Sequence, residues 1–384
     1  MGIKLSSGKQ QQFGPPPSGH PTSSAGLPQK EPMMQKLLRW SRVALTVITV
    51  VYVLCIAVIV WAIEFDAEDH HLSAVLMYMP QYIWLFPLFV LTPLCLMIYS
   101  RLVLAHVVVV AFVLFWFMDY VRKGERTPGG PTFTVMTNNI GQDHGKSIED
   151  FVAAEQPDII VLQDAGRRGP KYQEMFPDKY LRGEDQFLII SKFPIINGGV
   201  LPLVDLEDRP VAAWFEIDLN GFEIYVFALH MPTPRDQLNA IKGTGLLGSV
   251  TARMGKEGHA TKVYKEGKEF FKYQLDLANK MVDFTKEADK PFVVCGDFNI
   301  PTHGKTYRAY KRAWLEVFDE VGSGYGYTFP GDAKITKIFG PWLRLDNIYC
   351  SRDLLPISAT AESGRGSQHL SMVATIELPR QRIE

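Results

Sequence analysis

Cysteine is scarce in this sequence, and charge is missing from one long stretch of it. The 384 residues include only 4 cysteines, two of them in an apolar region, which excludes a disulfide framework. From Arg42 to Asp119 the only charged residues are one acidic cluster and Arg101. The whole chain is 47% hydrophobic and has a formal net charge of -1, which excludes collagen-like and fully disordered proteins. The uneven distribution of charge therefore predicts separate membrane and soluble parts.

The first 35 residues are predicted to be a disordered tail. Met1 to Pro32 is rich in Gly, Pro, Ser and Gln and has few aliphatic side chains. Such a segment buries too little apolar surface to offset the entropy lost on ordering.

Residues 36–121 are predicted to form a membrane domain with three transmembrane helices. Val43–Ile63 is an uninterrupted apolar run of about 21 residues, enough to cross a hydrocarbon layer of about 30 Å. The uncharged stretch from Leu72 to Ser100 and the run from Leu102 to Met118 read as a helical hairpin that turns at Arg101. The expected spans are about 43–63, 78–100 and 102–119. A buried core helix and a signal peptide are the alternatives for the first run.

Charges beside the first span predict its orientation. Four basic residues precede this span and four acidic residues follow it, namely Lys30, Lys36, Arg39 and Arg42 before it and Glu64, Asp66, Glu68 and Asp69 after it. Positive charge favours the cytoplasmic side. We therefore expect a multi-pass protein of the cell membrane with a cytoplasmic N-terminus and an extracytoplasmic domain, although Arg122, Lys123 and Arg126 favour the opposite orientation.

After a linker at 122–131, which contains Thr127-Pro-Gly-Gly-Pro131, residues 132–384 read as one soluble α/β domain. Strand-like runs in adjacent pairs mix with helical stretches, which favours sheets packed face to face with helices outside. The expected strands are Thr132–Ile140, Asp158–Gln163, Phe187–Ser191, Val211–Leu219, Phe222–His230, Phe292–Cys295, Leu343–Cys350 and Met372–Leu378. The expected helices are Ser147–Glu155, Gly267–Ala288 and Lys305–Val317. Asn220-Gly221 predicts a hairpin turn.

Residues 239–267 form a glycine-rich, lysine-containing segment that is long for a loop in a compact domain. Two interpretations stay open. The segment is either a basic flap beside a phosphate-bearing substrate or a solvated insertion.

Polar residues at the ends of predicted strands carry the functional signal. Gly296-Asp297-Phe298-Asn299 places a carboxylate and an amide at the rim of a sheet, and other polar groups follow or interrupt neighbouring strands. The ordered set of motifs resembles the endonuclease/exonuclease/phosphatase superfamily. The pieces are Met136-Thr137-Asn138-Asn139-Ile140, Ile160-Val161-Leu162-Gln163-Asp164, Ile189-Ile190-Ser191-Lys192-Phe193-Pro194, Ala228-Leu229-His230-Met231, the Gly-Asp-Phe-Asn segment, Leu343-Arg344-Leu345-Asp346 and Ser367-Gln368-His369.

The resemblance implies a four-layer α-β-β-α sandwich of two mixed sheets that hydrolyses phosphoester bonds with a divalent cation. Oxygen ligands suit Mg²⁺ or Mn²⁺, and no Cys/His cluster in the sequence suggests zinc.

The resemblance also implies a role for each matching residue. Asn139 and Asp164 would hold the metal, and Asp346 would be a further metal ligand or a histidine partner. Asp297 would orient and deprotonate the attacking water, and Asn299 would position that water or a phosphate oxygen. Two histidines, His230 and His369, would donate to the phosphoryl oxygens. The basic residues expected to bind substrate are Lys192, Arg209 and Arg344.

Two positions depart from the family pattern. Asp164 stands where the family usually has Glu, which shortens a metal ligand by one methylene. Gln368 stands where the family has Asp beside the histidine. A carboxylate raises the pKa of a neighbouring imidazole. We therefore expect a lower pKa for His369 than in relatives, a slower or retuned enzyme, and a rate increase in Gln368→Asp.

The sequence leaves the substrate open. From Pro131 onward the chain has 30 Lys and Arg against 34 Asp and Glu, a net charge of -4, and a basic surface for nucleic acid is not evident. Nucleic acid, a phospholipid headgroup (as in sphingomyelinase-like relatives) and small phosphoesters are all compatible with the motifs. A catalytically weakened, membrane-anchored binding module is the non-enzymatic alternative.

Overall fold

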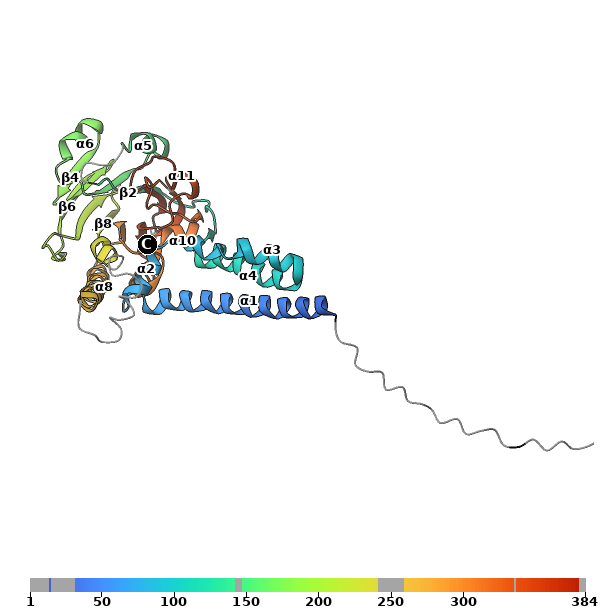
Figure 1. The fold of residues 1–384 in the computed structure, drawn as a ribbon. Helices are drawn as coiled ribbons and strands as arrows, with labels where there is room; N and C mark the ends of the chain where they lie inside the picture. The colour runs from blue at the N-terminus through green and yellow to red at the C-terminus, as the bar shows by residue number, and fades with distance from the viewer. Residues whose placement is uncertain (1–13, 15–31, 142–146, 241–258, 335, 380–384) are drawn as a thin grey trace, which may run out of the picture.

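The structure is a computed structural model that describes residue 14 and residues 32–141, 147–240, 259–334 and 336–379 (Figure 1). The predicted tail at 1–35 lies almost wholly outside these residues. Most of the 239–267 segment also lies outside them, but its end from His259 onward belongs to a long helix, α8 (His259–Lys286).

Two six-stranded mixed sheets form the soluble domain, as predicted. The first has the order β13-β14-β2-β3-β5-β4, with β13 at Leu355–Ala361, β14 at Met372–Glu377, β2 at Thr132–Asn139, β3 at Ile159–Gln163, β5 at Phe187–Ser191 and β4 at Tyr180–Glu184. The second has the order β10-β12-β9-β8-β7-β6, with β10 at Leu315–Glu316, β12 at Asp346–Cys350, β9 at Phe292–Asp297, β8 at Glu223–His230, β7 at Ala212–Asp218 and β6 at Ile195–Val200. One parallel pair occurs in each sheet, β2–β3 and β8–β9.

Three apolar clusters define the layers of the sandwich. The central cluster joins the facing sides of both sheets through residues such as Phe133, Val161, Phe215 and Val293. A second cluster packs the outer face of the second sheet against α8 and α9 (Gly304–Ala313). The third packs the outer face of the first sheet against α5 (Glu149–Glu155) and α6 (Gly169–Met175). The expected four-layer α-β-β-α order is therefore present.

Local predictions agree with the structure except at a few elements. All eight expected strands form, and Asn220 and Gly221 take positive φ values of 59° and 94°, as a tight hairpin turn requires. The expected helix at Lys305–Val317 is wrong only at its last four residues. It ends at Ala313, because the chain continues into the short strand β10 and then into α10 (Val317–Val321).

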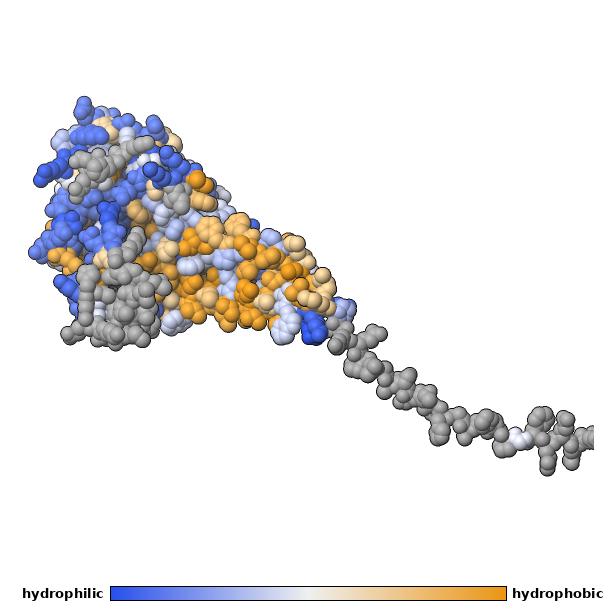
Figure 2. Space-filling model, viewed as in Figure 1, coloured by the Kyte–Doolittle hydropathy of each residue, from blue (hydrophilic) through white to orange (hydrophobic). Residues whose placement is uncertain are grey.

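Three apolar helical segments are long enough to cross a membrane: Met33–Asp66, Gln81–Ile98 and Ser100–Phe117. The first is the single helix α1. The second contains η1 (Gln81–Leu85) and α3 (Leu88–Ile98), and the third contains η2 (Ser100–Leu102), α4 (Val103–Phe112) and η3 (Val113–Phe117). Figure 2 shows their exposed surface as a continuous hydrophobic region beside the hydrophilic domain.

Contacts at the two ends of the helical array fit the thickness of a bilayer. At one end Arg42 Nε donates to Ile98 O at 3.3 Å. At the other end Glu64 lies 2.6 Å from His303 of the soluble domain. The 22 positions between Arg42 and Glu64 correspond to about 33 Å of helix, close to a hydrocarbon thickness of about 30 Å.

Two segments outside these spans contact the soluble domain. Leu72–Tyr78, expected to lead into the second span, instead belongs to a separate helix, α2 (His71–Tyr78), whose Ala74 packs against Phe270 and Phe271 of α8. The predicted linker at 122–131 is held against the domain. Its start pairs with a strand of the domain, β1 (Val121–Arg122) with β11 (Ser323–Gly324), and Arg126 binds Glu320 at 2.9 Å.

Candidate active site

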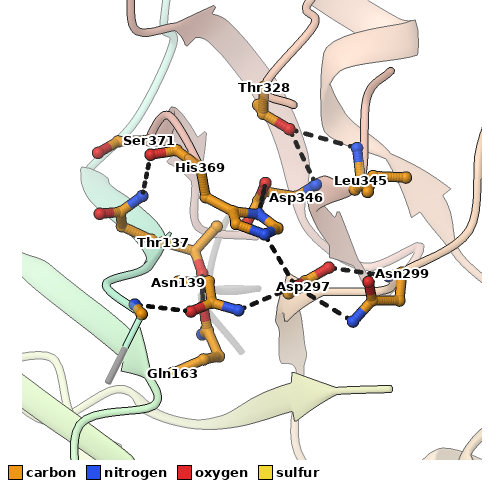
Figure 3. Close-up of polar contacts among 12 residues, drawn as sticks. Thr137, Asn139, Gln163, Asp297, Asn299, Thr328, Leu345, Asp346, His369 and Ser371 are labelled. Carbon is orange, nitrogen blue, oxygen red and sulfur yellow. Dashed lines mark hydrogen bonds and ion pairs between the residues drawn. The ribbon is translucent and has the colours of Figure 1, made fainter. Parts of the chain in front are cut away.

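The ends of five strands bring the predicted residues to one edge of the sandwich. In the second sheet His230 is the register partner of Asp297, and Asp297 is also the partner of Asp346. In the first sheet Asn139 ends β2 beside Gln163, and Asp164 follows directly. The side chain of Asn139 then joins the two sheets by donating to Asp297 Oδ2 at 2.9 Å (Figure 3).

A cavity of about 540 Å³ opens at this edge. Its lining includes most of the predicted catalytic and metal residues, namely Asn139, Asp164, His230, Asp297, Asn299 and His369. Asp346 lies behind them with no exposed surface, and Thr328 Oγ1 accepts its backbone N–H at 3.1 Å. The predicted convergence of these side chains is therefore present.

Asp297 is a buried carboxylate of the cavity that accepts several hydrogen bonds. It is 1% exposed, and it accepts hydrogen bonds from the backbone N–H of Asn299 at 2.9 Å and from Asn299 Nδ2 at 3.2 Å. Its strand passes so close to β8 that a Cβ at Gly296 would lie 1.9 Å from Leu229 O, which explains the glycine. Burial raises the pKa of Asp297, while the charges of His369 and Asp346 act in opposite directions.

His369 is held by Asp346 and not by its neighbour in the sequence. His369 Nδ1 donates to Asp346 Oδ2 at 2.9 Å, and Nε2 lies 3.6 Å from Asp297 Oδ2. Burial alone would lower the pKa of His369, but the two carboxylates outweigh it and raise the pKa to about 9. The carboxylate partner of His369 therefore comes from β12, so Gln368 does not leave the imidazole without an acidic partner. The expectation of a lower pKa than in relatives stays a prediction.

His230 has a partner that the sequence did not reveal. Its Nδ1 lies 2.6 Å from Gln186 Oε1 and 3.8 Å from Asp164, and its Nε2 lies 3.8 Å from Asp297. Gln186 also donates to Pro210 O at 2.6 Å, which fixes its amide. A single polar residue before a buried strand gives too weak a signal for this role to be predicted.

The residues at the base of the cavity fit a divalent cation. Among the described residues, ligand atoms of Asp297, Asp346 and His369 lie within 4.8 Å of one another. Asp346 Oδ1 is buried and has no hydrogen-bond partner in the described part of the chain, which is costly for a carboxylate oxygen unless a cation compensates it. The carboxylates of this cluster are hard oxygen donors, which suit Mg²⁺ or Mn²⁺.

Comparison with known proteins identifies the family. Residues 136–369, more than half of the chain, match the model of the Endonuclease/Exonuclease/phosphatase family. The chain belongs to this family. No curated protein matches it.

Solved structures with a similar fold include the following three. A family member from Bacteroides thetaiotaomicron is 16% identical, with a TM-score of 0.48, over 65% of this chain and 98% of that one. A humanized TDP2 of D. rerio is 13% identical, with a TM-score of 0.45, over 64% and 99%. The mannosyl-6-phosphatase Bt3783 of B. thetaiotaomicron VPI-5482 is 15% identical, with a TM-score of 0.44, over 64% and 99%.

As an endonuclease/exonuclease/phosphatase family member with this acidic cluster, the protein is a metal-dependent hydrolase of phosphoester bonds.

Of its three predicted substrate-binding cations, only Arg209 lines the cavity, where it pairs with Asp205 at 2.8 Å. Lys192 follows β5 and pairs with Asp158, at the end of β3 opposite the cavity, so it does not fit this role. Arg344 does not fit it either, because its side chain is fully buried beside Asp119 and Glu316.

One cavity residue comes from outside the family domain. Tyr78 of α2 lines the cavity, and its hydroxyl donates to the backbone oxygen of Asn299 at 2.8 Å. Burial raises the pKa of Tyr78 well above its usual value, which keeps the phenol protonated. In the sequence, Tyr78 is recognisable only as an aromatic residue near a predicted membrane span.

Proposed function

We propose that the protein is a membrane-anchored phosphoesterase in which Asp297 orients and deprotonates the attacking water. The observation that carries this role is the position of Asp297, which faces the cavity between two histidines while Asn139 and Asn299 hold both of its oxygens. A raised pKa suits a carboxylate that accepts a proton during the reaction.

The histidines are proposed to stabilise the phosphoryl group. His369 has a pKa raised to about 9, so at neutral pH it carries a proton for a phosphoryl or leaving-group oxygen. His230, oriented by Gln186, faces the same space. Asn299 is proposed to position the water or a phosphate oxygen. Arg209 is the one predicted cation placed to attract the substrate's charge.

The metal ligands are proposed to be Asn139, Asp164 and Asp346. They combine an amide with carboxylates, a ligand set for Mg²⁺ or Mn²⁺. A bound divalent cation would supply positive charge against the phosphoryl oxygens and lower the pKa of a bound water. The orphaned oxygen of Asp346 supports its place in this set.

The three apolar helices are proposed to anchor the protein with its N-terminus in the cytoplasm. Lys36, Arg39 and Arg42 lie at the start of α1, and Arg101 lies in η2 at the same end of the array, because Arg42 bonds to Ile98. Four cations at one end favour the cytoplasmic side for that end. The catalytic domain lies at the other end, which makes it extracytoplasmic.

A phospholipid headgroup is the substrate class that one observation favours. Tyr78, in the wall of the cavity, is only three residues before Gln81, where the second candidate span begins. Three residues reach about 10 Å at most, so the cavity wall lies near the bilayer surface. Nucleic acid and small phosphoesters stay as alternatives that the assay below separates.

The test uses the full chain in nanodiscs, with Mg²⁺ or Mn²⁺ and with chelator, on sphingomyelin and glycerophospholipid vesicles, plasmid DNA, RNA and a chromogenic phosphodiester. We expect metal-dependent turnover that Asp297→Asn lowers by about 10²–10⁴-fold, the usual contribution of a general base. Asp276→Asn, an exposed aspartate on α8, is the matched control. Equal rates for Asp297→Asn and wild type would refute the catalytic role. Metal-dependent binding without turnover would favour the binding-module alternative.

A further inference from the structure

We infer that the membrane-proximal segment, residues 64–78, positions the catalytic centre. In this inference Tyr78 and Glu68 are positioning residues for the catalytic loop, defined as residues 297–306. The inference rests on the proposed role of Asp297. It goes beyond the family domain, because residues 64–78 lie outside the matched region at 136–369.

Tyr78 holds the middle of the catalytic loop. Its hydroxyl donates to Asn299 O at 2.8 Å, and Asn299 itself has a left-handed backbone with φ of 50°. The same Asn299 donates its backbone N–H to Asp297 Oδ1. Trp342 Nε1 fixes the other side of this contact by donating to Tyr78 O at 3.2 Å. A shift of Tyr78 is therefore transmitted to Asp297 through one residue.

Glu68 holds the end of the catalytic loop. Its Oε1 accepts the backbone N–H groups of Lys305 and Thr306, the latter at 2.9 Å, so it caps the first turn of α9 from another part of the chain. The loop is shaped for this carboxylate, because Gly304 has φ of +85° and a Cβ there would lie 2.5 Å from Glu68 Oε1.

Further pairs hold the segment to the same helix end. Glu64 lies 2.6 Å from both His303 Nδ1 and Arg308 Nη1, and Asp69 pairs with Lys305. Behind it, α2 rests on α8 through Ala74. The segment is thus bonded to the catalytic loop on one side and supported on the other, which is the arrangement expected of a positioning element.

The consequence is a dependence of catalysis on a hydrogen bond outside the family domain. Misplacement of a reacting group by about 1 Å costs up to about 10²-fold in rate. Loss of one of the several contacts that hold the catalytic loop should lower the rate by a smaller factor. For Tyr78→Phe we expect kcat to fall about 5–30-fold, with KM changed less than about twofold, because the ring still fills the cavity wall.

Tyr82 supplies the matched control. It lies four residues after Tyr78, and its hydroxyl has no hydrogen-bond partner among the residues that the structure describes. Tyr82→Phe should leave kcat unchanged. Glu68→Ala should lower kcat, and Glu68→Gln, which keeps an oxygen for the two N–H groups, should restore it. All variants are assayed as full chains in nanodiscs, with thermal unfolding as a check of the fold.

A second measurement does not depend on turnover. Hydrogen exchange of the backbone amides in 298–306 should quicken in metal-free Tyr78→Phe and stay unchanged in Tyr82→Phe. Wild-type kcat and wild-type exchange in Tyr78→Phe would overturn the inference. An inactive Asp297→Asn beside a fully active Tyr78→Phe would refute it alone, whereas an active Asp297→Asn would refute the proposed function.

A different observation points independently to a second membrane contact. In α11 (Thr336–Phe339), Ile338 is 77% exposed and Phe339 is 50% exposed. The Phe339 ring stacks on Tyr82 at 5.2 Å, and Tyr82 belongs to η1, where the second candidate span begins. Figure 1 shows α11 on the side of the domain nearest the α3–α4 hairpin. Lys334 and Lys337 beside these apolar residues are exposed.

The geometry points to an anionic bilayer as the occupant of this surface. Ile338 and Phe339 would enter the interface at the level of η1, and the two lysines would meet acidic headgroups. This contact would fix the tilt of the catalytic domain relative to the bilayer. An exposed aromatic residue such as Phe339 at the boundary of an apolar helix array is typical of membrane interfaces.

The test places an environment-sensitive fluorophore on Ile338→Cys in a Cys55→Ala background, since the other three cysteines are buried. Leu206→Cys, on a leucine that is 64% exposed, is the control. In nanodiscs of phosphatidylcholine and phosphatidylglycerol, the probe at 338 should shift to the blue and be quenched by lipid-attached spin labels, and the probe at 206 should not. Identical aqueous spectra at both positions would overturn the proposal.

Discussion

Arg344 offers a sharp test of whether a cation beside a catalytic motif binds substrate or supports the fold. Its guanidinium has no exposed surface. It lies 2.5 Å from Asp119, just after the third apolar helix, and 3.0 Å from Glu316, which is fully buried. It also donates to Tyr325 O at 3.1 Å and lies over the Phe318 ring. The structure therefore predicts that Arg344→Met is a stability variant.

The size of the effect follows from the burial of Glu316. Removing one partner of a buried ion pair costs about 3–5 kcal/mol, because the remaining charge is left without compensation. For a domain of this size, about 1 kcal/mol corresponds to about 2–4 °C in Tm, so Arg344→Met should lose about 6–20 °C. Asp119→Asn should cost less, since Asp119 is 27% exposed. Arg344→Met/Glu316→Gln should recover much of the loss.

The assay compares thermal unfolding of the full chain in detergent with kcat and KM at a temperature where every variant is folded. We expect a lower Tm for Arg344→Met with KM unchanged. A wild-type Tm with a KM raised tenfold or more would show that Arg344 contacts the substrate and would refute the structural role. The double variant separates the two explanations further, because Glu316→Gln cannot restore a lost substrate contact.

Three further predictions concern single side chains. Burial raises the pKa of Glu68 in the folded protein, although backbone N–H donors lower it. The contribution of Glu68 to stability is therefore complete below its ordinary pKa of 4.5, and it is lost as the pH rises through the pKa that Glu68 has in the folded protein. Glu68→Gln should therefore gain Tm relative to wild type between pH 4 and 7.5, and a pH-independent difference would contradict this. Gln186→Ala should lower kcat about tenfold, because it removes the hydrogen-bond partner of His230 Nδ1, and it should change Tm by less than about 4 °C. An unchanged kcat would show that Asp164 orients His230 instead. Gln368→Asp should lower the half-saturating metal concentration but leave the pH profile unchanged, since Asp346 already holds His369; a shifted profile would contradict that pairing.

The fold was predictable from the sequence wherever strands follow simple alternation or continuous apolar runs. The missed strands break those patterns. β6 contains Gly198 and Gly199, and a Cβ at Gly198 would lie 2.9 Å from the Phe215 ring, so the glycine that weakens the strand signal is required by packing. β13 contains Pro356 at an irregular point of its register. Both strands lie at sheet edges, where such residues are tolerated.

The site was predictable where function resides in ordered motifs and unpredictable where it depends on register between distant segments. Asp297 and His369 follow from their motifs. Asp346 was expected as a metal ligand or a histidine partner, and its contact with His369, which precedes β14, depends on how the two sheets lie against each other. Gln186 depends in the same way on where the chain enters β5. The prediction that Arg344 binds substrate was wrong for a local reason. Arg344 precedes β12, so the alternation of side chains along that strand does not place it on the same side as Asp346.

The acidic cluster at the end of α1 shows how one set of charges supports two interpretations. As a count, Glu64, Asp66, Glu68 and Asp69 indicate the side of the membrane to which α1 leads. In the structure, Glu64, Glu68 and Asp69 bind the start of α9, and Lys305 and Arg308 compensate much of their charge. Residues with this structural reason for being acidic are weak evidence of topology. The orientation argument therefore depends on the other end of the array, where Arg42 and Arg101 are held near the hairpin turn and no acidic residue among those described compensates them.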